Sequence, residues 1–138
     1  MPGSGKSYYL TGLGVNAISS DAIRLQLADD VNDQTIHARV FETMRYLARQ
    51  RLEMKRPVTY IDATSLTRKD RRQFVELAKE CGAVAEALYF DVPLELCMER
   101  NAGRGRVVPP EVLKMMAAKL EPPEIEEGFD RVTVVRPE

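Results

Sequence analysis

The sequence predicts an α/β fold with three layers, α/β/α, in which helices cover both faces of a parallel sheet. Two observations predict this fold. Helix-like and strand-like stretches alternate along the chain, and a short segment rich in glycine and containing lysine, typical of phosphate binding, begins it. With 138 residues, of which 44% are hydrophobic, the chain is long enough for one domain and too short for two. We therefore expect residues 1–138 to form a single domain.

Periodic apolar residues, together with residues that start and stop helices, predict where the helices lie. The predicted helices are 4–13 (ended near Gly14), 21–27, 34–55, 67–80, 93–99 and 109–120. Ser20 or Asp21 would cap the second helix, Thr67 would cap the fourth, and Pro93 would open the fifth. Apolar side chains at helical spacing would face the core: Ile36, Val40, Met44, Leu47, Phe74, Leu77, Ala78, Cys81, Val112, Leu113, Met116 and Leu120.

Runs of β-forming residues predict strands at 15–19, 58–61, 83–92 and 132–135. In a parallel sheet, ligands bind beyond the carboxyl ends of the strands. Asp21 follows the first strand, Asp62 closes the second and Asp91 closes the third. We expect Asp21 and Asp62 to face a bound phosphate from different sides, and Asp91 to be a turn residue.

The first residues carry most of a phosphate-binding loop. The motif is G-x-x-x-x-G-K-S/T, and Gly3-Ser4-Gly5-Lys6-Ser7 matches its end, while its first glycine would lie one residue before Met1. Glycines let backbone N–H groups wrap a phosphate, Lys6 would place its charge on the β- and γ-phosphates, and the Ser7 hydroxyl would bind Mg²⁺. The alternative is an N-terminus that is simply rich in glycine and serine.

Asp62, which follows four β-forming residues, is typical of the acidic end of a Walker B strand and would bind Mg²⁺ directly or through water. The alternative is an ordinary aspartate at a strand end. Asp21 and Arg24 lie three residues apart on a predicted helix, and this spacing brings them to one face. A carboxylate that accepts a hydroxyl proton, beside a guanidinium that binds an anionic group, suits the acceptor site of a kinase. The alternative for Asp21 is a helix cap.

Three arginines lie among glycines near residues 100–108: Arg100, Arg104 and Arg106. Such a lid segment would close over ATP, with an arginine stabilising charge on the transferring phosphoryl group. The alternative is a solvated basic loop. We expect His37, the sole histidine, to occupy a polar surface position, and the charged run 68–72 to be a solvated helix start.

Charge and composition narrow the class of protein. The chain has 20 Lys+Arg against 21 Asp+Glu, which excludes a disordered polyelectrolyte and a generally basic protein that coats nucleic acid. Cys81 and Cys97 lack neighbours that bind metals, so we expect core packing and a reducing cytoplasmic location. No apolar run approaches the length of about 20 residues that a membrane span needs, and no signal-peptide pattern appears. We therefore expect no membrane partner.

These motifs, in their order, resemble P-loop kinases of the polynucleotide 5′-hydroxyl kinase type, and the small AAA family ATP-binding proteins related to them and to zeta toxins. The residues that carry the resemblance are Gly3-Ser4-Gly5-Lys6-Ser7, Ser20-Asp21-x-x-Arg24, Ile61-Asp62-Ala63-Thr64, Arg100-Asn101-x-x-Arg104 and Val108-Pro109. The resemblance covers nearly the whole chain. It implies a kinase-type P-loop NTPase fold, with ATP and Mg²⁺ as cofactors and a hydroxyl acceptor as substrate.

The resemblance also implies roles for single residues. Asp21 would be the general base, Arg24 would contact a phosphate of the acceptor, and Asp62 would organise the metal. Gly3, Ser4, Gly5, Lys6 and Ser7 would bind the nucleotide, with Lys6 also catalytic and Ser7 also a metal ligand. Arg100 and Arg104 would lie over the ATP phosphates, with Arg104 contacting the transition state.

The sequence departs from the family pattern at its start. The first strand, which is central in the family's sheet, is missing from this chain, so we expect two neighbouring strands to lack a shared partner. We also expect the natural protein to begin upstream, with Met1 as an internal methionine. Bulky Tyr8-Tyr9 follow the loop, and the accompanying phosphatase or ligase domains are absent. The acceptor therefore stays open between a polynucleotide 5′ end and a small metabolite or nucleotide sugar, and a non-catalytic ATP-binding module is a further alternative.

Overall fold

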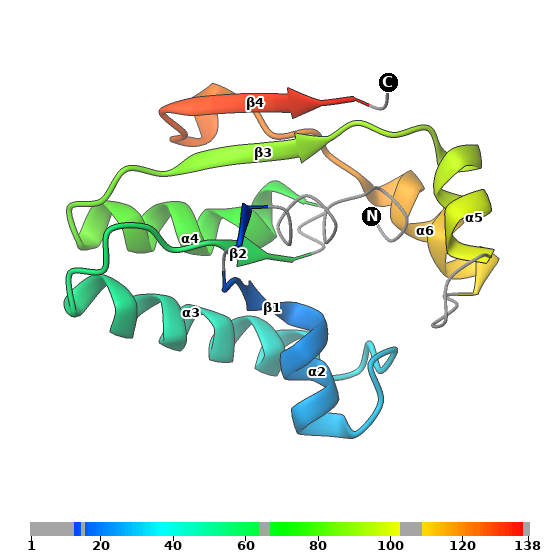
Figure 1. Cartoon of the computed structure of the whole chain (residues 1–138), viewed down its shortest axis with the longest axis horizontal. Helices are drawn as coiled ribbons and strands as arrows, with labels where there is room; N and C mark the ends of the chain where they lie inside the picture. Colours follow the sequence, from blue (N-terminus) through cyan, green and yellow to red (C-terminus); the bar gives the residue numbers. More distant parts are fainter. Residues whose placement is uncertain (1–12, 15, 64–66, 103–108, 137–138) are drawn as a thin grey trace.

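The structure, a computed structural model, describes residues 13–14, 16–63, 67–102 and 109–136. Helices and parallel strands alternate along these residues, as the sequence predicts (Figure 1). The helices are α2 (Ser20–Ala28), α3 (His37–Glu53), α4 (Arg68–Glu80), α5 (Leu94–Ala102) and α6 (Pro110–Lys119), with a single 3₁₀ turn, η1 (Ile125–Glu127). The strands are β1 (Ile18–Ser19), β2 (Ile61–Asp62), β3 (Glu86–Phe90) and β4 (Arg131–Val135). The predicted helix 4–13 lies almost wholly outside the described residues.

The strands form two parallel pairs within the described residues. β1 pairs with β2, and β3 pairs with β4 along five residues, from Glu86 opposite Arg131 to Phe90 opposite Val135. In the described part of the chain, no hydrogen-bonded ladder links one pair to the other. The expectation that the missing first strand leaves two neighbouring strands without a shared partner stays a prediction.

Both strands of the first pair are shorter than the predicted ranges 15–19 and 58–61. Only Ile18–Ser19 and Ile61–Asp62 stand opposite each other in a ladder, although the Ile18 N–H also donates to the Tyr60 carbonyl at 2.9 Å. Asp62 is therefore the last residue of its strand. β3 is likewise shorter than the predicted 83–92, because its pairing with β4 covers only Glu86–Phe90.

Local hydrogen bonds decide where α2 and α3 begin. The Ser19 side chain, and not that of Ser20 or Asp21, caps α2 by accepting a hydrogen bond from the Ala22 N–H at 3.2 Å. The predicted caps were wrong because Ser20 is already helical. α3 begins later than the predicted residue 34. The Asp33 carboxylate accepts from the Thr35 N–H at 2.9 Å, and a turn of this kind competes with the helix.

The start of α4 and the end of α5 can also be compared with the prediction. Thr67 caps α4 as predicted, since its hydroxyl accepts from the Asp70 N–H at 3.2 Å. α5 runs on to Ala102, so Arg100 lies in the last turn of a helix. The prediction placed this residue at the start of a loop segment, 100–108, beyond a helix ending at 99. A basic side chain near a helix C-terminus is stabilised by the helix dipole, which favours the longer helix.

The main core lies where α2, α3 and β1 meet α4. Its buried side chains are Ile18, Ile23, Val40, Phe41, Met44, Ala48 and Leu77, with Ile36, Leu52, Ile61, Ala63, Phe74 and Cys81 packed against them. Leu47, predicted to face this core, is exposed, and Ala48 takes the inward position. α5 and α6 contact each other, and each has one fully buried apolar side chain, Cys97 on α5 and Leu113 on α6. Both cysteines are free thiols.

Met44 and Leu47 offer a paired test of this core. Met44 is 0% exposed and Leu47 is 40% exposed on the same helix. We expect Met44→Ala to lower the free energy of unfolding by about 2–5 kcal/mol, because it leaves a cavity. Leu47→Ala should change it by about 0.5 kcal/mol or less. Urea denaturation of both variants measures the difference, and equal losses would contradict the core described here.

Candidate functional site

The candidate site lies at the carboxyl ends of β1 and β2. Ser19 stands opposite Asp62 in the parallel register, which brings both strand ends to the same edge. Ser19 also caps α2, whose first turn contains Asp21. Two acidic side chains that are 41 positions apart in sequence therefore start from neighbouring backbone positions at one edge of the sheet. The structure therefore brings Asp21 and Asp62 to one edge, and their expected place on either side of a phosphate stays a prediction.

Asp21 and Arg24 form an ion pair along α2, with Nη1 of Arg24 at 3.6 Å from Oδ1 of Asp21. The predicted spacing therefore brings them to one face. Their exposures differ greatly, since the Arg24 side chain is 6% exposed and the Asp21 side chain is 46% exposed. Arg24 is buried because it shares the inward side of α2 with Ser20 and Ile23. The half-exposed carboxylate marks the open side of this pair.

The guanidinium of Arg24 keeps unused hydrogen-bonding capacity. Its Nε is buried and has no hydrogen-bond partner within the described residues. A buried charge is costly unless it is paired and hydrogen-bonded, so an unpartnered donor at this position is an expensive feature. A donor of this kind suits an anionic or polar group that is absent from the protein alone.

The loop between α2 and α3 adds a second negative charge near Arg24. Hydrogen bonds from the hydroxyl and then the backbone N–H of Thr35 hold the pKa of Asp33 below its ordinary value, and the charge of Arg24 adds a smaller effect. Asp33 is therefore ionised at neutral pH. Arg24 therefore has two carboxylates near it, Asp21 on its own helix and Asp33 on the following loop.

The structure does not place several of the predicted site residues. Gly3, Ser4, Gly5, Lys6 and Ser7 lie outside the described residues, and so does Arg104. Arg100 is described, and its side chain is exposed near the end of α5. Burial raises the pKa of the Cys97 thiol on the same helix, and the positive charge of Arg100 partly offsets this rise. The roles of these residues stay predictions.

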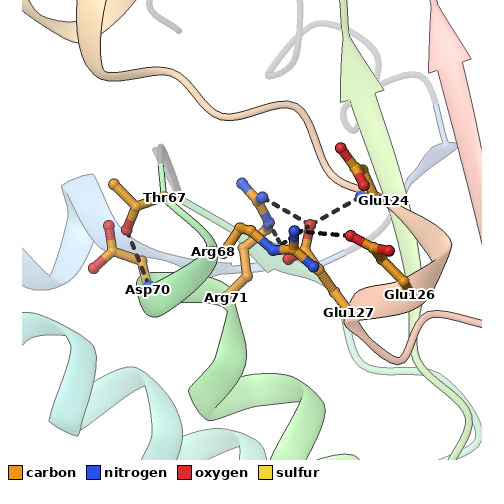
Figure 2. Close-up of polar contacts among 7 residues, drawn as sticks. All are labelled: Thr67, Arg68, Asp70, Arg71, Glu124, Glu126 and Glu127. Atoms are coloured by element: carbon orange, nitrogen blue, oxygen red, sulfur yellow. Dashed lines mark hydrogen bonds and ion pairs between the residues drawn. The ribbon is translucent and has the colours of Figure 1, made fainter.

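A buried ion pair on α4 was missed by the sequence analysis. We expected 68–72 to be a solvated helix start, but Arg71 is buried and its guanidinium binds Glu127 through two parallel contacts (Figure 2). The expectation was wrong because Arg71 lies on the inward side of α4, with Val75 and Ala78. The spacing of 71, 75 and 78 was the signal that could have revealed it.

Hydrogen bonds keep Glu127 charged in this buried position. Burial alone would raise the pKa of its carboxyl group, but hydrogen bonds from Arg71 and from the backbone N–H of Glu124 lower the pKa below its ordinary value. His37 lies at a polar surface position, as expected, with its side chain 42% exposed. Its Nε2 lies 3.3 Å from Oδ1 of Asp70, and its ring lies against Phe41 with centroids 4.5 Å apart.

In the described part of the chain, no group of three or more His, Cys, Asp or Glu side chains is placed to hold a metal ion. None of the helices in that part has the length and apolar character needed to cross a membrane.

Comparison with known proteins adds two relatives and a family. The chain is 34% identical over 89 residues to the L-seryl-tRNA(Sec) kinase of Methanococcus maripaludis, an alignment that covers 64% of this chain and 34% of that protein. It is 36% identical over 58 residues to the human L-seryl-tRNA(Sec) kinase, which covers 42% of this chain and 17% of that protein. The chain therefore spans about a third or less of the length of these relatives.

The family match covers most of the chain. Residues 1–123 match the AAA domain family, a range that includes the predicted phosphate-binding loop. With the parallel strands and alternating helices, this match confirms the predicted α/β P-loop fold. Both relatives are named as kinases, which supports the predicted enzyme class without singling out polynucleotide kinases. The chain belongs to the AAA domain family.

Proposed function

We propose that this chain is the phosphotransfer domain of an ATP-dependent kinase that phosphorylates a hydroxyl group on an anionic acceptor. The observation that carries the proposal is the pair formed by Asp21 and Arg24. A half-exposed carboxylate lies beside a buried guanidinium with an unpartnered Nε, on a helix that starts at the same strand edge as Asp62. A general base and an anion-binding group are the two functions that such an acceptor site needs.

In this proposal each side chain has a defined chemical role. The acceptor oxygen attacks the γ-phosphorus of ATP as its proton passes to the carboxylate of Asp21, and ADP leaves. Arg24 binds an anionic group of the acceptor and so orients its hydroxyl. The nucleotide phosphates bind the backbone of Gly3, Ser4, Gly5 and Ser7 and the amine of Lys6. Arg100 and Arg104 would bind the phosphates from the lid side.

Asp62 and Ser7 fit the ligand chemistry of Mg²⁺. Magnesium in nucleotide sites takes oxygen ligands and keeps several waters, so one or two protein ligands together with phosphate oxygens suffice. A half-buried carboxylate at the end of β2 supplies such an oxygen, and no larger acidic cluster within the described residues is required. The ion would neutralise charge on the β- and γ-phosphates.

The relatives favour one acceptor over another. The sequence resemblance pointed first to a polynucleotide 5′-hydroxyl. The relatives are named for a seryl group carried on tRNA, and that acceptor also presents a hydroxyl close to nucleic-acid phosphates. We therefore propose an RNA-borne hydroxyl, with the seryl hydroxyl of an aminoacyl-tRNA as the first candidate and a 5′-hydroxyl end as the second.

A transfer assay with labelled ATP tests this proposal. The natural full-length protein that carries this chain is incubated with γ-labelled ATP and, in separate reactions, seryl-tRNA(Sec), a 5′-hydroxyl oligonucleotide and free serine. We expect label on seryl-tRNA(Sec). Label on the oligonucleotide alone would select the second candidate. ATP binding without label on either nucleic acid would overturn the RNA-borne acceptor and favour a small metabolite or a non-catalytic module.

Asp21→Asn tests the general base. The substitution keeps the shape of the side chain and removes its ability to take a proton, so we expect turnover to fall by about 10²–10⁴-fold. The affinity for ATP, measured by calorimetry, should be unchanged because Asp21 acts on the acceptor. Asp29→Asn is the matched control, since Asp29 ends the same helix with a left-handed backbone that asparagine also tolerates. Full activity of Asp21→Asn would show that another group is the base.

Arg24→Gln tests the anion-binding role. We expect the KM for the acceptor to rise by about 10–100-fold, since a charge-assisted hydrogen bond is lost. The affinity for ATP should stay constant. Thermal unfolding measured in parallel reports any structural cost of replacing a buried side chain. A variant that unfolds at lower temperature but keeps the acceptor KM would restrict Arg24 to a structural role.

A further inference from the structure

The Arg71–Glu127 ion pair joins α4 to the segment that leads into β4. Nε of Arg71 lies 2.9 Å from Oε1 of Glu127, and Nη2 lies 2.9 Å from Oε2. The two side chains are only 9% and 6% exposed. Two parallel contacts between a planar guanidinium and a carboxylate define both the distance and the relative orientation of the two elements. Figure 2 shows Glu127 reaching from η1 to the first turns of α4.

The segment around η1 is built to present Glu127. The backbone N–H of Glu124 donates to Oε2 of Glu127 at 2.8 Å, so the same carboxylate closes the turn and binds α4. The next residue, Gly128, has φ of 114°, and a Cβ at this position would lie 2.6 Å from Cγ1 of Val75 on α4. The backbone of the segment therefore packs directly on the helix. A side chain at 128 would push the two elements apart.

The first turn of α4 is also held from its other side. Thr67 caps the helix, and the Arg71 N–H donates to the Thr67 carbonyl at 3.3 Å. Asp70 lies 3.3 Å from the ring of His37, the first residue of α3. The first turn of α4 therefore contacts η1 on one side, through Arg71, and the start of α3 on the other, through Asp70.

The position of this turn bears directly on the candidate site. The Asp70–His37 contact joins this turn to α3, and α3 packs against α2, which carries Asp21 and Arg24. The described part of the chain has no ladder between the β1–β2 pair and the β3–β4 pair. In the same described part, α4 contacts α3, which packs on the β1–β2 pair, and also contacts η1, which precedes β4.

The energy cost of burying the Arg71–Glu127 pair suggests that it serves to position α4 and η1 and not mainly to stabilise the fold. Burying two charges costs desolvation energy that their attraction only partly repays, so an apolar pair of similar volume would often be at least as stable. An ion pair with two defined contacts instead specifies one arrangement of the elements that it joins. The neighbouring pair between Arg68 and Glu126 joins the same two elements, but its side chains are 40% and 65% exposed. That exposed pair contributes little to either stability or geometry.

We propose that Arg71 and Glu127 are positioning residues for phosphotransfer. Their pair fixes the first turn of α4, and through the contact of this turn with α3 it fixes α2, which carries Asp21 and Arg24. The inference rests on the proposed kinase function. No proton or phosphoryl group passes through the pair, which acts by geometry alone.

Two variants and a matched control test this role in the natural full-length protein. Glu127→Gln keeps the shape of the side chain and removes its charge, while Arg71→Lys keeps the charge and removes the planar fork. We expect each to lower kcat by about a hundredfold, the loss that displacement of a reacting group by about 1 Å can cause. The affinity for ATP should change by about twofold or less, because Asp21 and Arg24, which the pair positions, act on the acceptor. Glu126→Gln, the control on the same turn, should leave kcat unchanged.

Several outcomes would overturn the proposal. One is a Glu127→Gln variant that unfolds at lower temperature but retains wild-type kcat when assayed well below its Tm. Another is a fall in ATP affinity that matches the fall in kcat, because general damage and not positioning would then explain the loss. Equal losses in Glu127→Gln and the Glu126→Gln control would also contradict it.

Hydrogen exchange separates this proposal from the proposed function and does not depend on turnover. In the wild-type protein, the amides of Arg71 in α4 and of Gly128 after η1 should open with the same free energy, because one pair holds both segments. Different opening free energies would overturn the positioning role even if every variant failed to fold. If the opening is shared but the wild-type protein labels no acceptor, the proposed function fails and the coupling of α4 to η1 stands alone.

Discussion

The parallel register between β1 and β2 is the constraint on which the candidate site depends. The ladder is two residues long on each strand, yet it places Ser19 opposite Asp62. Ser19 then ends the strand and caps α2, so the same residue fixes both the sheet edge and the start of the helix that carries Asp21. A slip of one residue would turn Asp62 to the opposite face of the sheet. The core residues of α3, which pack against Ile18, support this short ladder.

The two buried arginines of the described chain show how differently a guanidinium can be accommodated. Arg71 has a bidentate carboxylate partner, Glu127, and the hydrogen bonds from Arg71 help to lower the pKa of that carboxyl group. Arg24 has an ion pair at 3.6 Å and a buried Nε without a partner among the described residues. The bidentate contact of Arg71 is made entirely within the protein, as expected for a residue with a structural role. The arrangement of Arg24 leaves one buried donor unused beside the half-exposed carboxylate of Asp21, and we propose that the acceptor's anionic group binds there.

Much of the fold was predictable because local rules decided it. Apolar spacing predicted α3 and α4, and the Thr67 cap of α4 was recognised from residue type alone. The strand ends led to Asp62, and the spacing of three residues led to the Asp21–Arg24 pair. The helix cap of α2 was predicted wrongly because several neighbouring residues could each have served as the cap. Ser19, Ser20 and Asp21 are all good caps, and only the strand that precedes them decides which one is used.

The sequence by itself determined the order of the elements, the P-loop fold class and the candidate residues of the acceptor site, because each depends on residues close together in the chain. Only the tertiary structure decided that the strands form two separate pairs in the described chain, and that Arg71 is buried against Glu127. These two residues are 56 positions apart, and several acidic side chains could have matched the charge of Arg71. Charge patterns do not identify a partner at that distance, since the choice depends on where the whole chain packs.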